Sequence, residues 1–134
     1  MPSTALRPSP ETSRSLQIAL AAAKTAADNR ASEVAVLDLR EMTPLFDYFV
    51  LATGTSRRQL HAISEDIDRV LQEEWGETRE GIEGYRESRW ILLDYGNVVI
   101  HLFDQETREY YSLEQLWSGA KPVELPADIV AARK

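Results

Sequence analysis

Hydrophobic and polar positions recur with two different periods along this chain, and the two periods predict where helices and strands lie. Apolar residues three and four positions apart indicate helices, each with a start signal and a stop signal. Ser9-Pro10 begins the first helix, while Ser56 and Gly76 bracket the second. The apolar stripe of the second helix consists of Leu60, Ile63, Ile67, Val70 and Leu71. The expected helices span residues 9–28, 56–76 and 112–119.

Short β-branched and aliphatic runs between these helices predict strands. The expected strands span residues 34–39, 46–53, 80–84, 90–95 and 98–103. Gly96-Asn97 joins the last two as a two-residue hairpin turn of the primed kind. These elements predict a single α/β domain over residues 10–119, between a flexible tail of residues 1–9 and a flexible tail of residues 120–134.

The hairpin turn fixes which side chains share a face of the sheet, because alternate residues of a strand point to opposite sides. One face carries Ile91, Leu93, Tyr95, Val98, Ile100 and Leu102 and is the expected core side. The other carries Trp90, Leu92, Asp94, Val99, His101 and Phe103. Aromatic residues beside an acid and a histidine are typical of an interface centre. The alternative is that a helix covers this face too, as in most α/β sheets.

Composition narrows the function classes. The 134 residues include no Cys, which excludes disulfides, thiol catalysis and cysteine-ligated zinc. The net charge of −7 repels nucleic acid phosphates and favours a basic protein partner. No apolar run reaches the roughly 18 residues that a membrane helix needs. The first ten residues lack the apolar core of a signal peptide, so we expect a soluble cytoplasmic protein.

The junction from strand to helix at Gly54 to Ser56 could be a site for phosphate or for an active serine. Free N–H groups at a helix start bind anions, and Arg57 and Arg58 would add charge. However, no Gly-Lys pair follows as in a P-loop, and Arg58 stands where a nucleophile elbow needs glycine. Ser56 and Gln59 have the spacing of a capping box, so we interpret the junction as scaffold.

The acids and histidines do not predict a catalytic site. Asp66 and Asp68 have the spacing of metal-binding acids in nucleotidyl transfer, but they fall in a helix, about 200° apart, instead of on a strand. We expect His61 to be solvated. We interpret His101 as a hydrogen-bonded structural histidine within reach of Asp94. We therefore expect no enzyme activity, no metal and no cofactor.

Three ordered motifs resemble those of the ribosomal silencing factor (Iojap-like) family. The first is residues 47–59, DYFVLATGTSRRQ. The second is Glu83-Gly84, then Trp90, then residues 93–103, LDYGNVVIHLF, and the third is residues 108–117, REYYSLEQLW. The similarity covers roughly residues 16–117. Asn97 departs from the pattern, because many members carry Asp there.

This resemblance implies a fold, a partner and an activity. The fold would be a central mixed β-sheet flanked by helices, related to nucleotidyltransferases but without their catalytic acids. Members bind the large ribosomal subunit through its ribosomal protein fourteen and block association with the small subunit, which represses translation when nutrients are limiting. The resemblance further implies little or no direct nucleic acid binding and a homodimer when free. The alternatives are a large-subunit assembly factor that uses the same face, or a nucleotide-binding enzyme.

The motifs also carry over site residues. The expected partner-binding residues are Trp90, Asp94, Tyr95, Asn97, His101, Tyr110, Tyr111 and Trp117. The expected structural turn and cap residues are Gly54, Ser56, Gln59 and Gly96. Trp90 is the strongest candidate for the interface. Tyr95 is in conflict, because strand alternation sends it to the core face.

Overall fold

Six strands form one mixed sheet in the order β3-β4-β5-β2-β1-β6 in the computed structural model, which describes residues 9–111, 115 and 117–133. The strands are β1 Ser32–Asp38, β2 Tyr48–Gly54, β3 Gly81–Glu83, β4 Trp90–Asp94, β5 Val98–Asp104 and β6 Lys121–Pro122. The helices are α1 Ser9–Asp28, α2 Arg57–Trp75, α3 Gln105–Tyr111 and α5 Ala127–Arg133. β2 and β5 run parallel and all other neighbours are antiparallel. The predicted α/β class with a mixed sheet is confirmed.

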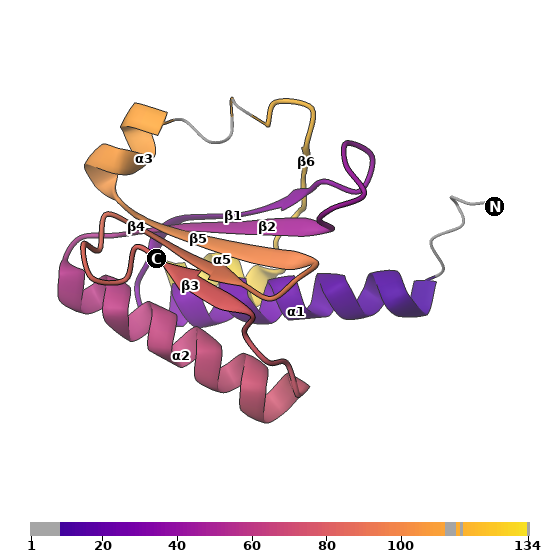
Figure 1. Cartoon of the computed structure of the whole chain (residues 1–134), viewed down its shortest axis with the longest axis horizontal. Coiled ribbons are helices and arrows are strands. Elements are labelled where there is room, and N and C mark those ends of the chain that lie inside the picture. Colours follow the sequence, from indigo (N-terminus) through magenta and orange to yellow (C-terminus); the bar gives the residue numbers. More distant parts are fainter. Residues whose placement is uncertain (1–8, 112–114, 116, 134) are drawn as a thin grey trace.

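The two faces of the sheet are covered differently. Figure 1 shows α1 and α2 together below the sheet and α3 above it. The lower core contains five fully buried alanines of α1, which let this helix lie close to the strands. Those alanines are Ala19, Ala22, Ala23, Ala26 and Ala27. The upper core is smaller and is formed by Leu37, Leu39, Phe49, Leu51, Val99 and Phe103.

The parallel pair at the centre of the sheet is buried on both sides. All seven residues of β2 are buried, and β5 is buried from Val98 to Phe103. The two strands pair over seven positions, from Tyr48 opposite Val98 to Gly54 opposite Asp104. Because a parallel partner cannot be reached by a tight turn, α2, β3 and β4 form the connection between them.

The hairpin of β4 and β5 has the predicted register. Trp90 pairs with Phe103, Leu92 with His101, and Asp94 with Val99. The loop is closed by a 3.0 Å bond from the Tyr95 N–H to the Val98 carbonyl. Gly96 has a φ of +86° as the first central residue of the turn, which agrees with the predicted primed turn. The predicted core face is therefore confirmed, and all six of its residues lie in the lower core.

The predicted flexible tail after residue 119 is wrong. Lys121 and Pro122 pair with β1 as β6, and Val123 donates its N–H to the Val36 carbonyl at 2.8 Å. The chain then crosses to the lower face, where α5 packs on α1 and Ile129 is only 2% exposed. A seven-residue helix has little periodicity of its own, so its order comes from tertiary contact, here through buried Ile129.

A helix also lies where none was expected. α3 follows β5 directly, and the Asp104 carboxylate accepts a 2.8 Å bond from the Thr107 N–H, as a cap does. The expected start of the last helix at Ser112 and its expected buried residues Leu113 and Leu116 lie outside the described residues, as do residues 1–8 of the expected N-terminal tail.

Gly84 provides a test of how tightly the hairpin is held against β3. A Cβ atom at Gly84 would lie 2.0 Å from the Trp90 carbonyl oxygen, and its φ is +77°. We expect Gly84→Ala to lower the free energy of unfolding by at least about 2 kcal/mol, because both the contact and the backbone conformation become strained. Urea denaturation followed by circular dichroism measures this.

Gly81→Ala is the matched control, since a Cβ at Gly81 would meet nothing within 4 Å. We expect its stability to stay within about 0.5–1 kcal/mol of the parent. Equal stability of the two variants would show that the approach of Gly84 to Trp90 is not a constraint.

Candidate functional site

Eight rings form a continuous group on the face of the sheet opposite α1 and α2, and we call this group the aromatic layer. Its members are Phe46, Phe49, Trp90, His101, Phe103, Tyr110, Tyr111 and Trp117. Each ring centroid lies within 5.4 Å of at least one other in the group. Tyr110 is 79% exposed and Tyr111 is 45% exposed, so the layer continues from a buried centre to an open edge.

Neighbouring strands of the sheet bring the central rings together. Phe49 on β2 lies two residues before Leu51, the residue opposite His101 on β5, and the rings of Phe49 and His101 meet edge to face at 4.5 Å. Trp90 is opposite Phe103 in the hairpin, with ring centroids 5.2 Å apart. Trp117 covers Phe49 from the segment that leads to β6, at 5.3 Å. None of the eight rings belongs to α1, α2 or α5.

Trp90 and His101 are joined by a hydrogen bond as well as by packing. The Trp90 indole Nε1–H donates to His101 Nδ1 at 3.0 Å. Burial lowers the pKa of His101 to about 4, so the imidazole is neutral at physiological pH. His101 is a hydrogen-bonded structural histidine, as predicted, but its partner is Trp90. The Asp94 carboxylate accepts the Gly96 N–H at 2.8 Å.

Arg108 fixes α3 on the sheet and was not predicted as a site residue. Its side chain is buried and donates to Thr53 Oγ1 at 2.9 Å, and its guanidinium lies 5.7 Å from the Phe103 ring centroid. This anchor places Tyr111 against Trp90, with centroids 5.0 Å apart. Arg108 lies in the third motif, but only the fold shows that it points to the end of β2.

Acidic groups lie on this face of the sheet and on α3. Asp94 is partly buried on the same face of β4 as Trp90, and exposed Glu83 is opposite Leu92, which places it on that face as well. Glu106 and Glu109 are exposed on α3. This part of the surface therefore combines partly exposed rings with negative charge, an arrangement that suits a basic protein surface.

The structure brings together most, but not all, of the predicted partner-binding residues. Trp90, His101, Tyr110, Tyr111 and Trp117 belong to the aromatic layer, and Asp94 lies on the same face of β4 as Trp90, four residues further along the strand. The exposed side chain of Asn97 is at the hairpin tip, where the Asn97 carbonyl accepts the Asp47 N–H at 2.7 Å. His101 is 4% exposed, so it supports the surface from below.

The structure does not place Tyr95 with the other predicted partner-binding residues. It lies on the opposite face, in the lower core, and is 6% exposed. Its hydroxyl donates to Asp68 Oδ1 at 2.7 Å, and burial together with this bond raises the pKa of Tyr95. The placement by strand alternation is confirmed. Tyr95 therefore does not share a surface with Trp90, and we assign it a structural role.

The Gly54–Ser56 junction is occupied by structural contacts. Ser56 Oγ accepts the Gln59 N–H at 3.1 Å, and Gln59 Oε1 accepts the N–H of Thr55, one residue earlier than in a capping box. Gln59 Nε2 donates to the Asn29 carbonyl at 3.0 Å, which ties the end of α1 to the start of α2. A Cβ at Gly54 would lie 2.8 Å from Leu60 Cδ2, so the junction needs its glycine for close packing. Two of the N–H groups that an anion would use are already bonded.

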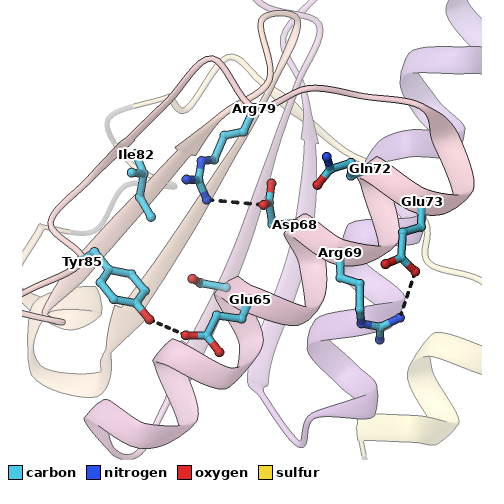
Figure 2. A pocket seen from close by; sticks show the side chains of 9 residues that line it. Glu65, Asp68, Arg69, Gln72, Glu73, Arg79, Ile82 and Tyr85 are labelled. Carbon is cyan, nitrogen blue, oxygen red and sulfur yellow. Dashed lines mark hydrogen bonds and ion pairs between the residues drawn. The ribbon is translucent and has the colours of Figure 1, made fainter.

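A groove of about 480 Å³ lies between α2 and β3. Figure 2 shows its charged side chains paired with one another across and along it. Tyr85 donates to Glu65 at 2.5 Å, Arg79 lies 3.7 Å from Asp68, and Arg69 pairs with Glu73. These pairs connect α2 to β3 and the following loop, and we interpret the groove as structural.

The expected solvated position of His61 is wrong. His61 stacks on Tyr85 with centroids 4.0 Å apart, and its Nε2 lies 2.7 Å from Ser88 Oγ. As predicted, Asp66 and Asp68 lie in α2, where Asp66 accepts from Asn29 and Arg69. Within residues 9–111, 115 and 117–133, no group of three or more His, Cys, Asp or Glu side chains is placed to hold a metal ion. Over the same residues, none of the helices has the length and apolar character that a membrane crossing requires.

Comparisons with known proteins agree with the resemblance of the three motifs. A family model described as "Ribosomal silencing factor during starvation" matches residues 11–134. The ribosomal silencing factor RsfS of Halalkalibacterium halodurans is 39% identical over 98 residues, which cover 73% of this chain and 83% of that protein. The RsfS protein of Bacillus subtilis is 37% identical over 110 residues, with 82% and 90% covered. A crystal structure of a Chromobacterium violaceum protein has a TM-score of 0.73 at 33% identity and covers 84% of this chain and 93% of the other.

Neutral, buried His101 should make the stability of the fold depend on pH. In the unfolded chain His101 has its ordinary pKa of 6.5, and in the folded chain burial lowers the pKa of His101 to about 4. Between these values unfolding is favoured by proton uptake, so stability falls as the pH falls. We expect a loss of about 3 kcal/mol from pH 6.5 to pH 4, measured by urea denaturation across this range. His101→Asn has no group to protonate in this range, so its free energy of unfolding should depend less steeply on pH than that of the parent. The same dependence on pH in both proteins would contradict the neutral buried state of His101.

Proposed function

Because this chain belongs to the ribosomal silencing factor family, we propose that it binds the large ribosomal subunit through the aromatic layer and blocks association with the small subunit. The consequence is repression of translation, under nutrient limitation as the family resemblance implies. The docking point that we propose is ribosomal protein fourteen of the large subunit. The site of action would be the cytoplasm.

The observation that carries this proposal is the open edge of the aromatic layer. Trp90 is partly buried there, between buried Phe103 and exposed Tyr111. Binding energy at protein interfaces concentrates in aromatic side chains of this kind, which are already held in place by their neighbours. Asp94, at the other end of β4, and Glu83, opposite Leu92, lie on the same face of the sheet as Trp90, in a chain with a net charge of −7. A basic ribosomal protein complements this surface, while the phosphates of nucleic acid are repelled by it.

The proposed mechanism is steric and involves no chemical step. The protein would occupy the surface of the large subunit that the small subunit contacts, so its activity depends on affinity and position alone. The same face could instead serve the assembly of the large subunit, and the two roles differ only in whether subunit joining is blocked. We also propose that the free protein is a homodimer, which sedimentation equilibrium would test.

A subunit-joining experiment separates these roles. The protein is added to purified large subunits before the small subunits, and the mixture is resolved on a sucrose gradient. Steric silencing requires that the protein migrate with the large subunit and that the joined peak be lost. Migration with the large subunit while joining continues would favour an assembly role. Absence of the protein from the large-subunit fraction would contradict the proposal.

Trp90→Ala should weaken binding to the large subunit by on the order of 2 kcal/mol, about 30-fold in Kd, because it removes the aromatic anchor. Binding is measured by pelleting with large subunits over a range of protein concentrations. Trp75→Ala is the matched control, since Trp75 packs against the lower core at the end of α2. We expect the control to bind like the parent. Equal affinity of Trp90→Ala and the parent would place the interface elsewhere.

Asp94→Lys should slow association with the large subunit by about five-fold at low ionic strength, and by less as salt screens the charge. Stopped-flow measurements at two salt concentrations test this. Asp128→Lys changes the net charge equally but lies on α5, on the lower face, and should leave the rate unchanged. Asp94→Asn keeps an acceptor for the Gly96 N–H and so separates loss of charge from loss of the turn. The same rate for Asp94→Lys and Asp128→Lys would exclude local steering.

A further inference from the structure

The hydrogen bond between Trp90 and His101 defines the chemical state of both side chains. An indole N–H can only donate, so His101 Nδ1 must offer a lone pair and cannot carry a proton. The proton of the neutral ring is therefore on Nε2. One orientation of the indole and one tautomer of the imidazole are specified together by this single contact.

The surroundings of His101 would otherwise favour an apolar residue. The ring is 4% exposed and packs against Phe49, Trp90 and Phe103. Within the described residues, His101 Nε2 is buried and has no hydrogen-bond partner. A buried N–H without an acceptor is unfavourable, whereas a leucine at this position would bury no polar group. Of the two ring nitrogens, only Nδ1 forms a hydrogen bond with the described residues, which it accepts from the Trp90 indole N–H.

Contacts other than this hydrogen bond fix the position of the Trp90 backbone. The Trp90 carbonyl lies against Gly84, and Trp90 is in register with Phe103. What these contacts leave undetermined is the rotation of the indole about its side-chain bonds. Two rotamers that place the N–H inward or outward present different edges of the ring to the surface. The contact with His101 selects the inward position of the N–H.

We infer that His101 is a positioning residue for docking: through Nδ1 it holds the indole of Trp90 with its N–H turned toward the sheet, so that the apolar edge of the ring faces the partner. This inference rests on the proposed function, in which Trp90 is the anchor. A pre-oriented ring loses less conformational entropy on binding than a mobile ring, so the hydrogen bond contributes to affinity without touching the partner. Loss of the acceptor would free the indole to turn its N–H toward water.

Two substitutions separate the acceptor from the bulk of the ring. His101→Leu keeps an apolar side chain of similar size in the layer but has no acceptor. His101→Asn places an oxygen about as far from the backbone as Nδ1 and can accept the indole N–H. Leu51→Val is the control for lost packing, because Leu51 is opposite His101 in the parallel pair and is fully buried. Urea denaturation verifies that each variant is folded.

The first measurement is hydrogen exchange of the Trp90 indole N–H in the free protein, without ribosomal subunits. In the ¹⁵N-labelled protein the indole N–H resonance of Trp90, assigned with Trp90→Phe, reports its hydrogen bond through its exchange with solvent deuterium. We expect exchange to be at least about tenfold faster in His101→Leu and close to the parent in His101→Asn and Leu51→Val. Unchanged exchange in His101→Leu would overturn the inference. Equally fast exchange in His101→Asn would overturn it too, since ring packing and not the acceptor would then hold Trp90.

The second readout is affinity for large subunits, measured with Trp90→Ala alongside. We expect His101→Leu to bind at least about tenfold more weakly than the parent, and His101→Asn within about threefold of it. If Trp90→Ala weakens binding and His101→Leu does not, the positioning role is wrong while the proposed docking face stands. If Trp90→Ala itself binds like the parent, the proposed docking face is wrong, whatever the exchange data show.

Discussion

The parallel pairing of β2 with β5 is the interaction on which the rest of the structure depends. It joins segments about 50 residues apart in sequence over seven positions, and both strands are buried on both faces. A parallel pair requires a crossover, and α2 provides it on the lower face, next to the alanine-rich α1. The same pair places Phe49 beside His101 on the upper face. The large core and the proposed docking surface thus lie on opposite faces of the same pair of strands.

The uneven covering of the sheet explains why one face is available for a partner. Helices α1 and α2 lie on the lower face, and α5 packs on α1 there (Figure 1). Among the described residues, the upper face is covered by the short α3, held by buried Arg108, and by the segment with Trp117. In the part of the chain that the structure describes, rings packed on one another cover the aliphatic side chains of the upper core. Toward α3 this packing ends in Trp90 and Tyr111, whose rings pack on each other while Trp90 is partly buried and Tyr111 is exposed. That combination suits an interface anchor.

Acidic side chains illustrate how spacing alone can mislead. Asp66 and Asp68 have the separation of a metal-binding pair, yet each has a structural partner. The Asp66 carboxylate accepts a hydrogen bond from Asn29, which joins α2 to the end of α1, and another from Arg69. These two bonds lower the pKa of Asp66. Asp68 accepts the hydroxyl of Tyr95 and so connects α2 to the hairpin. Both acids join neighbouring elements, and the acidic side chains proposed for the partner, Asp94 and Glu83, lie on the other face of the sheet, with Trp90.

Short-range interactions let the sequence alone determine the α2 cap at Ser56, the turn at Gly96, the hairpin register and the division of its residues between two faces. The C-terminal order and the contacts of His101 were decided only by the tertiary structure. A seven-residue helix such as α5 is stabilised by α1 and has no strong pattern of its own. The partner of His101 depends on which of several nearby groups the packed sheet brings to its Nδ1, and that group is Trp90. Local patterns specify elements, whereas the choice of distant partners requires the whole fold, because their contacts form only when the sheet closes.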